Sequence, residues 1–126
     1  MRVFKTKQFH RWVSGEILGD AELCLAAKEA FGGQVEADLG GYLFKKRIKR
    51  SGSGKSGGYR TIVGFRKTNQ NRIFFLFGFA KNERATISVR EQTALGTNAL
   101  ALISLTDEQI IALLGRAAIF ELECET

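Results

Sequence analysis

The chain has 126 residues, 44% of them hydrophobic, which is enough for one domain with its own core. Nineteen Lys and Arg outweigh thirteen Asp and Glu, and the net charge of +6 favours an anionic partner. The sequence contains no apolar run long enough for a membrane span or a signal sequence, so we expect a cytoplasmic protein without membrane contacts. Cys24 and Cys124 show no metal-ligand spacing, and we expect isolated small thiols rather than a disulfide scaffold.

The N-terminal third predicts a short strand over Met1 to Lys5 and then two helices. Apolar residues at helical spacing continue as far as Ile17, which predicts a first helix up to the break at Gly19. Asp20 is expected to cap a second helix, which the glycine pair 32–33 ends. Helices joined this closely form an antiparallel hairpin.

The middle third changes to a period of two, which is typical of strands. We expect strands over Tyr42 to Arg50 and over Tyr59 to Lys67, separated by a Gly/Ser loop over 51–58. After a turn at 68–71, the segment from Ile73 to Ala80 is apolar on both faces, which predicts a central strand covered on both sides.

The last third is predicted to be helical. Two capping boxes, Ser88 with Glu91 and Thr106 with Gln109, mark the starts of two helices, and 118–123 is expected to be a closing strand or an extended tail. The whole pattern predicts a small single α+β domain over 1–126, with an N-terminal strand and α-hairpin packed on a mostly antiparallel twisted sheet and with C-terminal helices. Residues 106–126 would form a C-terminal extension.

Positive charge is concentrated in one part of the chain. Residues 39–82 contain eleven Lys and Arg and no Asp or Glu. Strand alternation places Lys45, Arg47 and Lys49 on one face, and the ends of the neighbouring strands add Arg60 and the segment 81–84. We expect these cations to converge on one concave face that binds a polyphosphate backbone. The alternative is a solvated basic face without chemistry.

Three segments together resemble a known family: 45–47 (KKR), 55–60 (KSGGYR) and 79–84 (FAKNER). At this spacing, and from about Val3 onward, the chain is similar to RelE/HigB-type toxins of bacterial type II toxin–antitoxin systems, within the RelE/ParE superfamily. The resemblance implies a RelE-like fold and a metal-independent endoribonuclease, an mRNA interferase that inhibits translation on the ribosome. In that reaction the 2′-hydroxyl attacks the adjacent phosphate and leaves a 2′,3′-cyclic phosphate.

Carried over to matching positions, the resemblance implies these catalytic residues: Lys45, Arg47, Arg60, Lys81 and Arg84. We further expect RNA or phosphate contacts from Lys46, Lys49, Arg50, Lys55, Tyr59 and Asn82. Lys45 or Lys81 would act as the general base, while the general acid is left open, because Ser88 stands where well-known members have a tyrosine. Asn82 likewise replaces a typical arginine, for which Arg84 is the alternative. Tyr59 is the nearby aromatic alternative to the missing tyrosine, with packing in the core left open as its other role.

The implied partners are mRNA, the ribosome and a cognate antitoxin that often carries a helix-turn-helix DNA-binding domain. We expect no metal, no small-molecule cofactor and no membrane contact. Two alternatives stay open: a ParE-like toxin that inhibits DNA gyrase without catalysis, and a non-catalytic RNA- or DNA-binding module.

Overall fold

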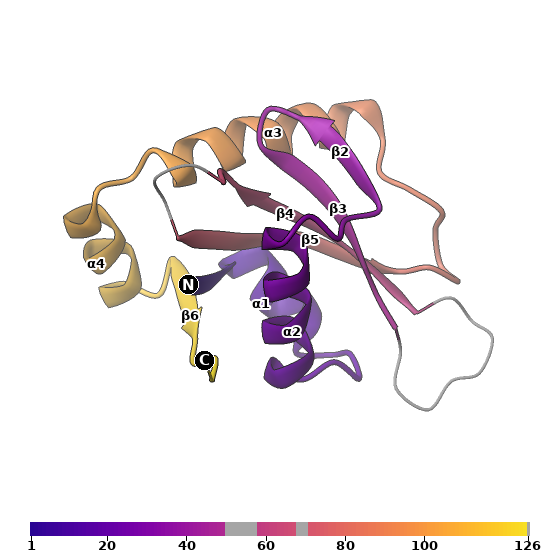
Figure 1. Cartoon of the computed structure of the whole chain (residues 1–126), viewed down its shortest axis with the longest axis horizontal. Coiled ribbons are helices and arrows are strands. Elements are labelled where there is room, and N and C mark those ends of the chain that lie inside the picture. The colour runs from indigo at the N-terminus through magenta and orange to yellow at the C-terminus, as the bar shows by residue number, and fades with distance from the viewer. Residues whose placement is uncertain (50–57, 68–70, 126) are drawn as a thin grey trace.

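The computed structural model describes residues 1–49, 58–67 and 71–125, which form four helices and six strands (Figure 1). The elements in chain order are β1 (Arg2–Thr6), α1 (Lys7–Val13), α2 (Asp20–Phe31), β2 (Ala37–Gly40), β3 (Leu43–Ile48), β4 (Tyr59–Phe65), β5 (Arg72–Ala80), α3 (Val89–Ile103), α4 (Asp107–Gly115) and β6 (Ile119–Leu122). The predicted α+β class is confirmed.

The strands form one sheet in the order β2-β3-β4-β5-β1-β6. β1 pairs with β5 in parallel, and the other neighbours pair in antiparallel fashion, so the sheet is mostly antiparallel as predicted. β5 lies inside the sheet between β4 and β1, which explains why its sequence is apolar on both faces. The edge strand β2 was not predicted, because Asp and Gly are poor strand residues.

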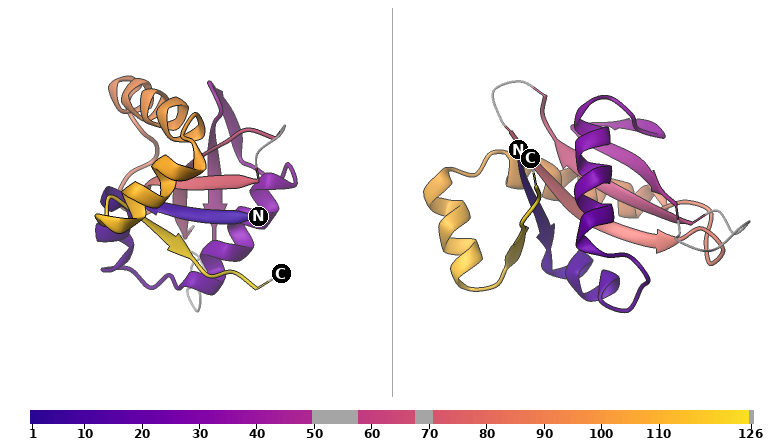
Figure 2. Two further views of the ribbon diagram at one scale, coloured as in Figure 1. Left: turned by 90° about the vertical axis from the view of Figure 1, so that its left-hand side faces the viewer. Right: turned by 60° about the horizontal axis from the view of Figure 1, so that its bottom comes forward.

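Helices cover both faces of the sheet, with α1 and α2 on one side and α3 on the other (Figures 1 and 2). Each face has its own hydrophobic cluster among the described residues: Leu23 and Ala27 of α2 meet one face, and Leu95 and Ala99 of α3 meet the other. Gly78 of β5 makes room for an aromatic ring, since an added Cβ there would lie 2.2 Å from the Trp12 side chain.

The first helix is shorter than predicted. It ends at Val13, where the amide of Ser14 donates to the His10 carbonyl, and Ile17 lies beyond it with 61% of its surface exposed. The predicted cap of the second helix is also shifted by one residue. Gly19 is the N-cap, and its amide donates to the Glu22 carboxylate at 3.1 Å, so Asp20 is already helical.

The C-terminal part completes the sheet. Both predicted capping boxes are present, with the Ser88 hydroxyl accepting from the Glu91 amide and the Thr106 hydroxyl from the Gln109 amide. β6 pairs with β1, which decides between a closing strand and a tail in favour of the strand. Among the described residues no single helix is long and apolar enough to cross a membrane; the bent pair α3 and α4 meets that length and composition test only when taken together.

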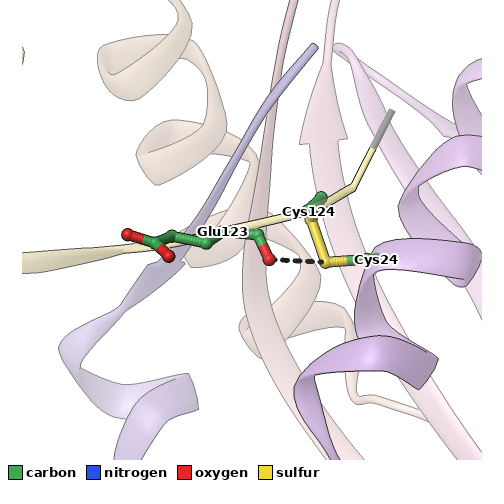
Figure 3. The surroundings of a disulfide bond; sticks show 3 residues. All are labelled: Cys24, Glu123 and Cys124. Carbon is green, nitrogen blue, oxygen red and sulfur yellow. Dashed lines mark hydrogen bonds between the residues drawn. A yellow bond between two sulfur atoms is a disulfide. The ribbon is translucent and has the colours of Figure 1, made fainter.

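A disulfide joins Cys24 in α2 to Cys124, which follows β6 (Figure 3). The expectation of isolated thiols was therefore wrong. The two residues are 100 positions apart, and their Cα atoms lie 5.6 Å from each other because β6 runs back beside β1 and carries the tail toward α2. Spacing along the chain gave no sign of this contact, because it depends on the unpredicted placement of the last strand.

Candidate functional site

Pairing of β3 with β4 brings three cations together. Arg47 lies directly opposite Arg60, and Lys45 lies opposite Ile62, so strand alternation places Lys45, Arg47 and Arg60 on one side of the ribbon. Arg47 is exposed at the surface, whereas Arg60 and Lys45 keep only 8% and 14% of their side chains exposed. The geometry thus joins two partly desolvated cations to an exposed one.

A carboxylate that the sequence analysis missed sits among these cations. Glu36 Oε2 lies 2.6 Å from Arg60 Nε, and Glu36 Oε1 lies 3.8 Å from Lys45 Nζ. The Glu36 amide donates to the Lys45 carbonyl at 2.7 Å, where the chain enters β2. Glu36 precedes the acid-free window, and only the unpredicted strand β2 reveals that it lies beside β3. We define Lys45, Arg60 and Glu36 as the clamp.

Two predicted contact residues are directed toward the face of the sheet that α1 and α2 cover. Lys46 Nζ lies 3.0 Å from Glu29 Oε1 of α2 and also donates to the Gln34 carbonyl. Tyr59 is 1% exposed, and its hydroxyl accepts from the Ile17 amide at 3.1 Å. Lys46 therefore anchors α2, and Tyr59 belongs to the hydrophobic core, which favours the core alternative over the expected RNA contact.

Of the remaining predicted residues, the structure describes Lys81 and Asn82 after β5 and Lys49 after β3. The Lys81 amide donates to the Gly58 carbonyl, which places Lys81 beside the start of β4, with its side chain exposed. Asn82 and Lys49 are also exposed. Arg50 and Lys55 lie outside the residues that the structure describes, so their predicted contacts stay predictions.

Arg84 is held by several partners. Its two terminal nitrogens donate to the carboxylate of Glu91, Nη1 at 3.1 Å, and its Nε donates to the Thr86 carbonyl at 3.0 Å. This pairing raises the pKa of Arg84. The same guanidinium, together with the backbone amide of Ser88, lowers the pKa of Glu91 to about 2. Glu91 also caps α3, so it ties Arg84 to the start of that helix.

A groove of about 760 Å³ opens beside the clamp, between α2, the end of β3 and the start of β4. Its walls combine apolar, acidic and basic side chains: Glu22, Leu25, Ala26, Glu29, Gln34, Val35, Glu36, Lys46, Arg47, Ile48, Lys49 and Arg60. Within the described part of the chain, no group of three His, Cys, Asp or Glu side chains is arranged to hold a metal ion.

This arrangement is suited to an anion that can exchange with a carboxylate. Arg60 offers a planar fork of donors, which matches phosphate oxygens, and Lys45 adds a compact positive charge. Because both are partly buried, their attraction for an anion is screened less than at an open surface. Glu36 supplies an acceptor for a proton at the same place.

One family model matches nearly the whole chain. It is described as "RelE toxin of RelE / RelB toxin-antitoxin system" and covers residues 1–122. The matched span includes all six described strands, from β1 to β6, and the clamp. A search of curated proteins finds no match.

Proposed function

This chain belongs to the RelE family of toxins from toxin–antitoxin systems, as the resemblance predicted, and on that premise we propose that it is an endoribonuclease that cuts mRNA. The observation that carries the proposal is the clamp, in which Arg60 and Lys45 share the carboxylate of Glu36. We further propose that cutting takes place on the ribosome and needs no metal ion.

The clamp suits the charge that develops during RNA cleavage. When the 2′-oxygen attacks the adjacent phosphorus, the phosphate passes through a five-coordinate state with additional negative charge on its oxygens. The bond from phosphorus to the 5′-oxygen then breaks, which leaves a 2′,3′-cyclic phosphate on one fragment and a 5′-hydroxyl on the other, after the leaving oxygen takes up a proton from a donor that is left unassigned. Cations fixed in advance stabilise the five-coordinate state more than the starting phosphate, and this difference accelerates the reaction. We assign Arg60 and Lys45 to the phosphate oxygens, and the exposed Arg47 to the backbone beside them.

Glu36 is the proposed general base. Lys45 or Lys81 was expected in this role, but Lys45 lies beside the Glu36 carboxylate, and we assign Lys45 to the phosphate instead. The Glu36 carboxylate can take the 2′-hydroxyl proton when a phosphate draws Arg60 and Lys45 away from it. Lys81 would contribute charge from the end of β5.

Membership of the family implies an antitoxin partner, and we propose which charge its contact surface carries. A chain with net charge +6 and exposed cations at Arg47 and Lys49 favours a partner with an acidic segment over this surface. Such a segment would neutralise the clamp region and block RNA at once. We also propose that the antitoxin carries a helix-turn-helix domain.

Primer extension on a reporter mRNA, with and without purified ribosomes, tests the proposal. The wild-type protein should give discrete stops that depend on ribosomes and persist in EDTA. Arg60→Ala should remove the stops, whereas Arg116→Ala, which changes an exposed arginine after α4, should leave them intact. Growth arrest without any RNA cleavage, together with inhibition of purified gyrase, would replace the proposal with the non-enzymatic alternative.

A further inference from the structure

Arg84 was expected to contact the reacting phosphate, but its donors are directed elsewhere. Glu91 accepts from both terminal nitrogens, and the Thr86 carbonyl accepts from Nε. A guanidinium has five N–H donors in one plane, and these partners take up three of them. Unlike Glu36, Glu91 is also held by the Ser88 amide as part of the cap of α3, so a phosphate displaces it less readily from Arg84 than it displaces Glu36 from Arg60. The positive charge is also balanced locally by Glu91, so Arg84 contributes little net charge to the site.

The guanidinium of Arg84 lies over two phenylalanine rings. Its guanidinium carbon lies 5.3 Å from the centre of the Phe79 ring and 5.7 Å from the centre of the Phe77 ring. Both rings belong to β5, and 37% of the Arg84 side chain is exposed to solvent. A guanidinium is planar, and one that is hydrogen-bonded along its edges, lies over aromatic rings and keeps part of its surface exposed can offer a flat surface for stacking.

This surface lies next to the clamp. Phe79 is directly opposite Arg60 in the pairing of β4 with β5. Thr86 connects the two places, because its carbonyl accepts from Arg84 and its hydroxyl lies 3.4 Å from Lys45 Nζ. Neighbouring strands lie about 5 Å apart, so the Arg84 guanidinium is within one or two strand spacings of the clamp.

We propose that Arg84 is a stacking platform for a nucleobase of the RNA, namely a base beside the phosphate held by Arg60 and Lys45. This inference rests on the proposed function and gives Arg84 a binding role rather than a catalytic one. Bases splayed out of a single strand commonly stack on guanidinium planes as well as on aromatic rings. The platform would fix the register of the RNA and so influence where it is cut.

RNA-binding affinities of the wild type and of Arg84→Lys, measured with intact and base-deleted oligonucleotides, test the platform. Lysine keeps the charge and removes the plane, and Arg90→Lys is the matched control on an exposed arginine nearby. The probe is an RNA oligonucleotide made uncleavable by 2′-deoxy substitution, titrated free in solution and as mRNA in the ribosomal decoding site. A parallel series of oligonucleotides lacks one base at a time.

For the platform, Arg84→Lys should weaken binding of the intact strand by roughly tenfold. Removal of one particular base should weaken wild-type binding by a similar factor and should have no further effect on Arg84→Lys. The slope of log Kd against log salt should be unchanged in the double variant Arg84→Gln/Glu91→Gln, because no phosphate contact is lost.

Two results would overturn the platform while the proposed function stands: equal losses for every missing base in wild type and Arg84→Lys, or a shallower salt slope in the double variant, which would indicate a phosphate contact. If the wild-type protein neither binds nor cuts RNA in either setting, both the platform and the proposed function are wrong. Circular dichroism and thermal melting of each variant verify that the fold is retained.

Discussion

Loss of the Cys24–Cys124 disulfide should lower stability substantially without abolishing the fold. The bond links α2 to the tail after β6, and β6 is itself held by pairing with β1. Reduction with dithiothreitol, or substitution of both cysteines by alanine, removes the link and leaves the two hydrophobic clusters on the sheet in place. The expected consequence is a lower melting temperature of a protein that still folds.

The size of the effect follows from the loop that the bond closes. With a separation of 100 residues, the chain-entropy model gives a loss of about 4.7 kcal/mol at 25 °C, whereas measured disulfides typically contribute about 2–4 kcal/mol. An unfolding entropy of about 2.1 cal/mol/K per residue gives about 0.26 kcal/mol/K for 126 residues. Tm should therefore fall by about 8–18 °C.

Calorimetry of the wild-type protein with and without dithiothreitol measures this shift. The double alanine variant is the internal control, because it should melt at the same temperature in both buffers, close to the reduced wild type. Thiol titration of the native protein should find no free cysteine. Two reactive thiols in the native protein, or a Tm that does not respond to reductant, would show that the bond is absent in solution.

Three further changes test other parts of the structure. Glu36→Gln should tighten binding of inorganic phosphate to the resting protein roughly fivefold, because about 1 kcal/mol of ion pairing with Glu36 no longer competes with the phosphate. The single-turnover rate of cleavage should fall at least ~10²-fold in the same variant. Weaker phosphate binding would count against the clamp. The lowered pKa of Glu91 means that its stabilising effect is fully present above its ordinary pKa of 4.5 and is lost as pH falls toward about 2, so acid unfolding of Glu91→Gln should be less steep in that window. An identical acid profile would refute the pairing with Arg84. Gly78→Ala should cost roughly 1–3 kcal/mol of unfolding free energy through its clash with Trp12, whereas Gly96→Ala, which meets nothing within 4 Å, should be neutral or stabilising in urea titrations.

Most of the fold was predictable because its signals are local. Alternation over β3 and β4, the apolar run of β5 and the two capping boxes each identify an element from neighbouring residues alone. The end of α1 was missed because Ile17 continues a helical spacing that the chain itself does not follow. The strand β2 was missed because its sequence, ADLG, carries no strand propensity and is held by pairing with β3.

The site was predictable as a set of residue types but not as a geometry. A window without carboxylates drew attention to Lys45 and Arg60, whose role as site residues stays a prediction, and it drew attention away from Glu36, which pairs with both. Alternation could not show that Tyr59 is core, because a tyrosine at a strand start suits either a buried or an exposed position. The disulfide could not be predicted either, because contacts between distant segments depend on tertiary placement.

The most direct test of the central claim is the single-turnover rate of mRNA cleavage on programmed ribosomes in the presence of EDTA, with the 3′ end of the product analysed by mass spectrometry. We predict a 2′,3′-cyclic phosphate for the wild type and a rate lower by ~10²–10³ for Arg60→Ala, with partial recovery in Arg60→Lys. Cleavage by Arg60→Ala at the wild-type rate, in a variant that melts as a folded protein, would contradict the clamp.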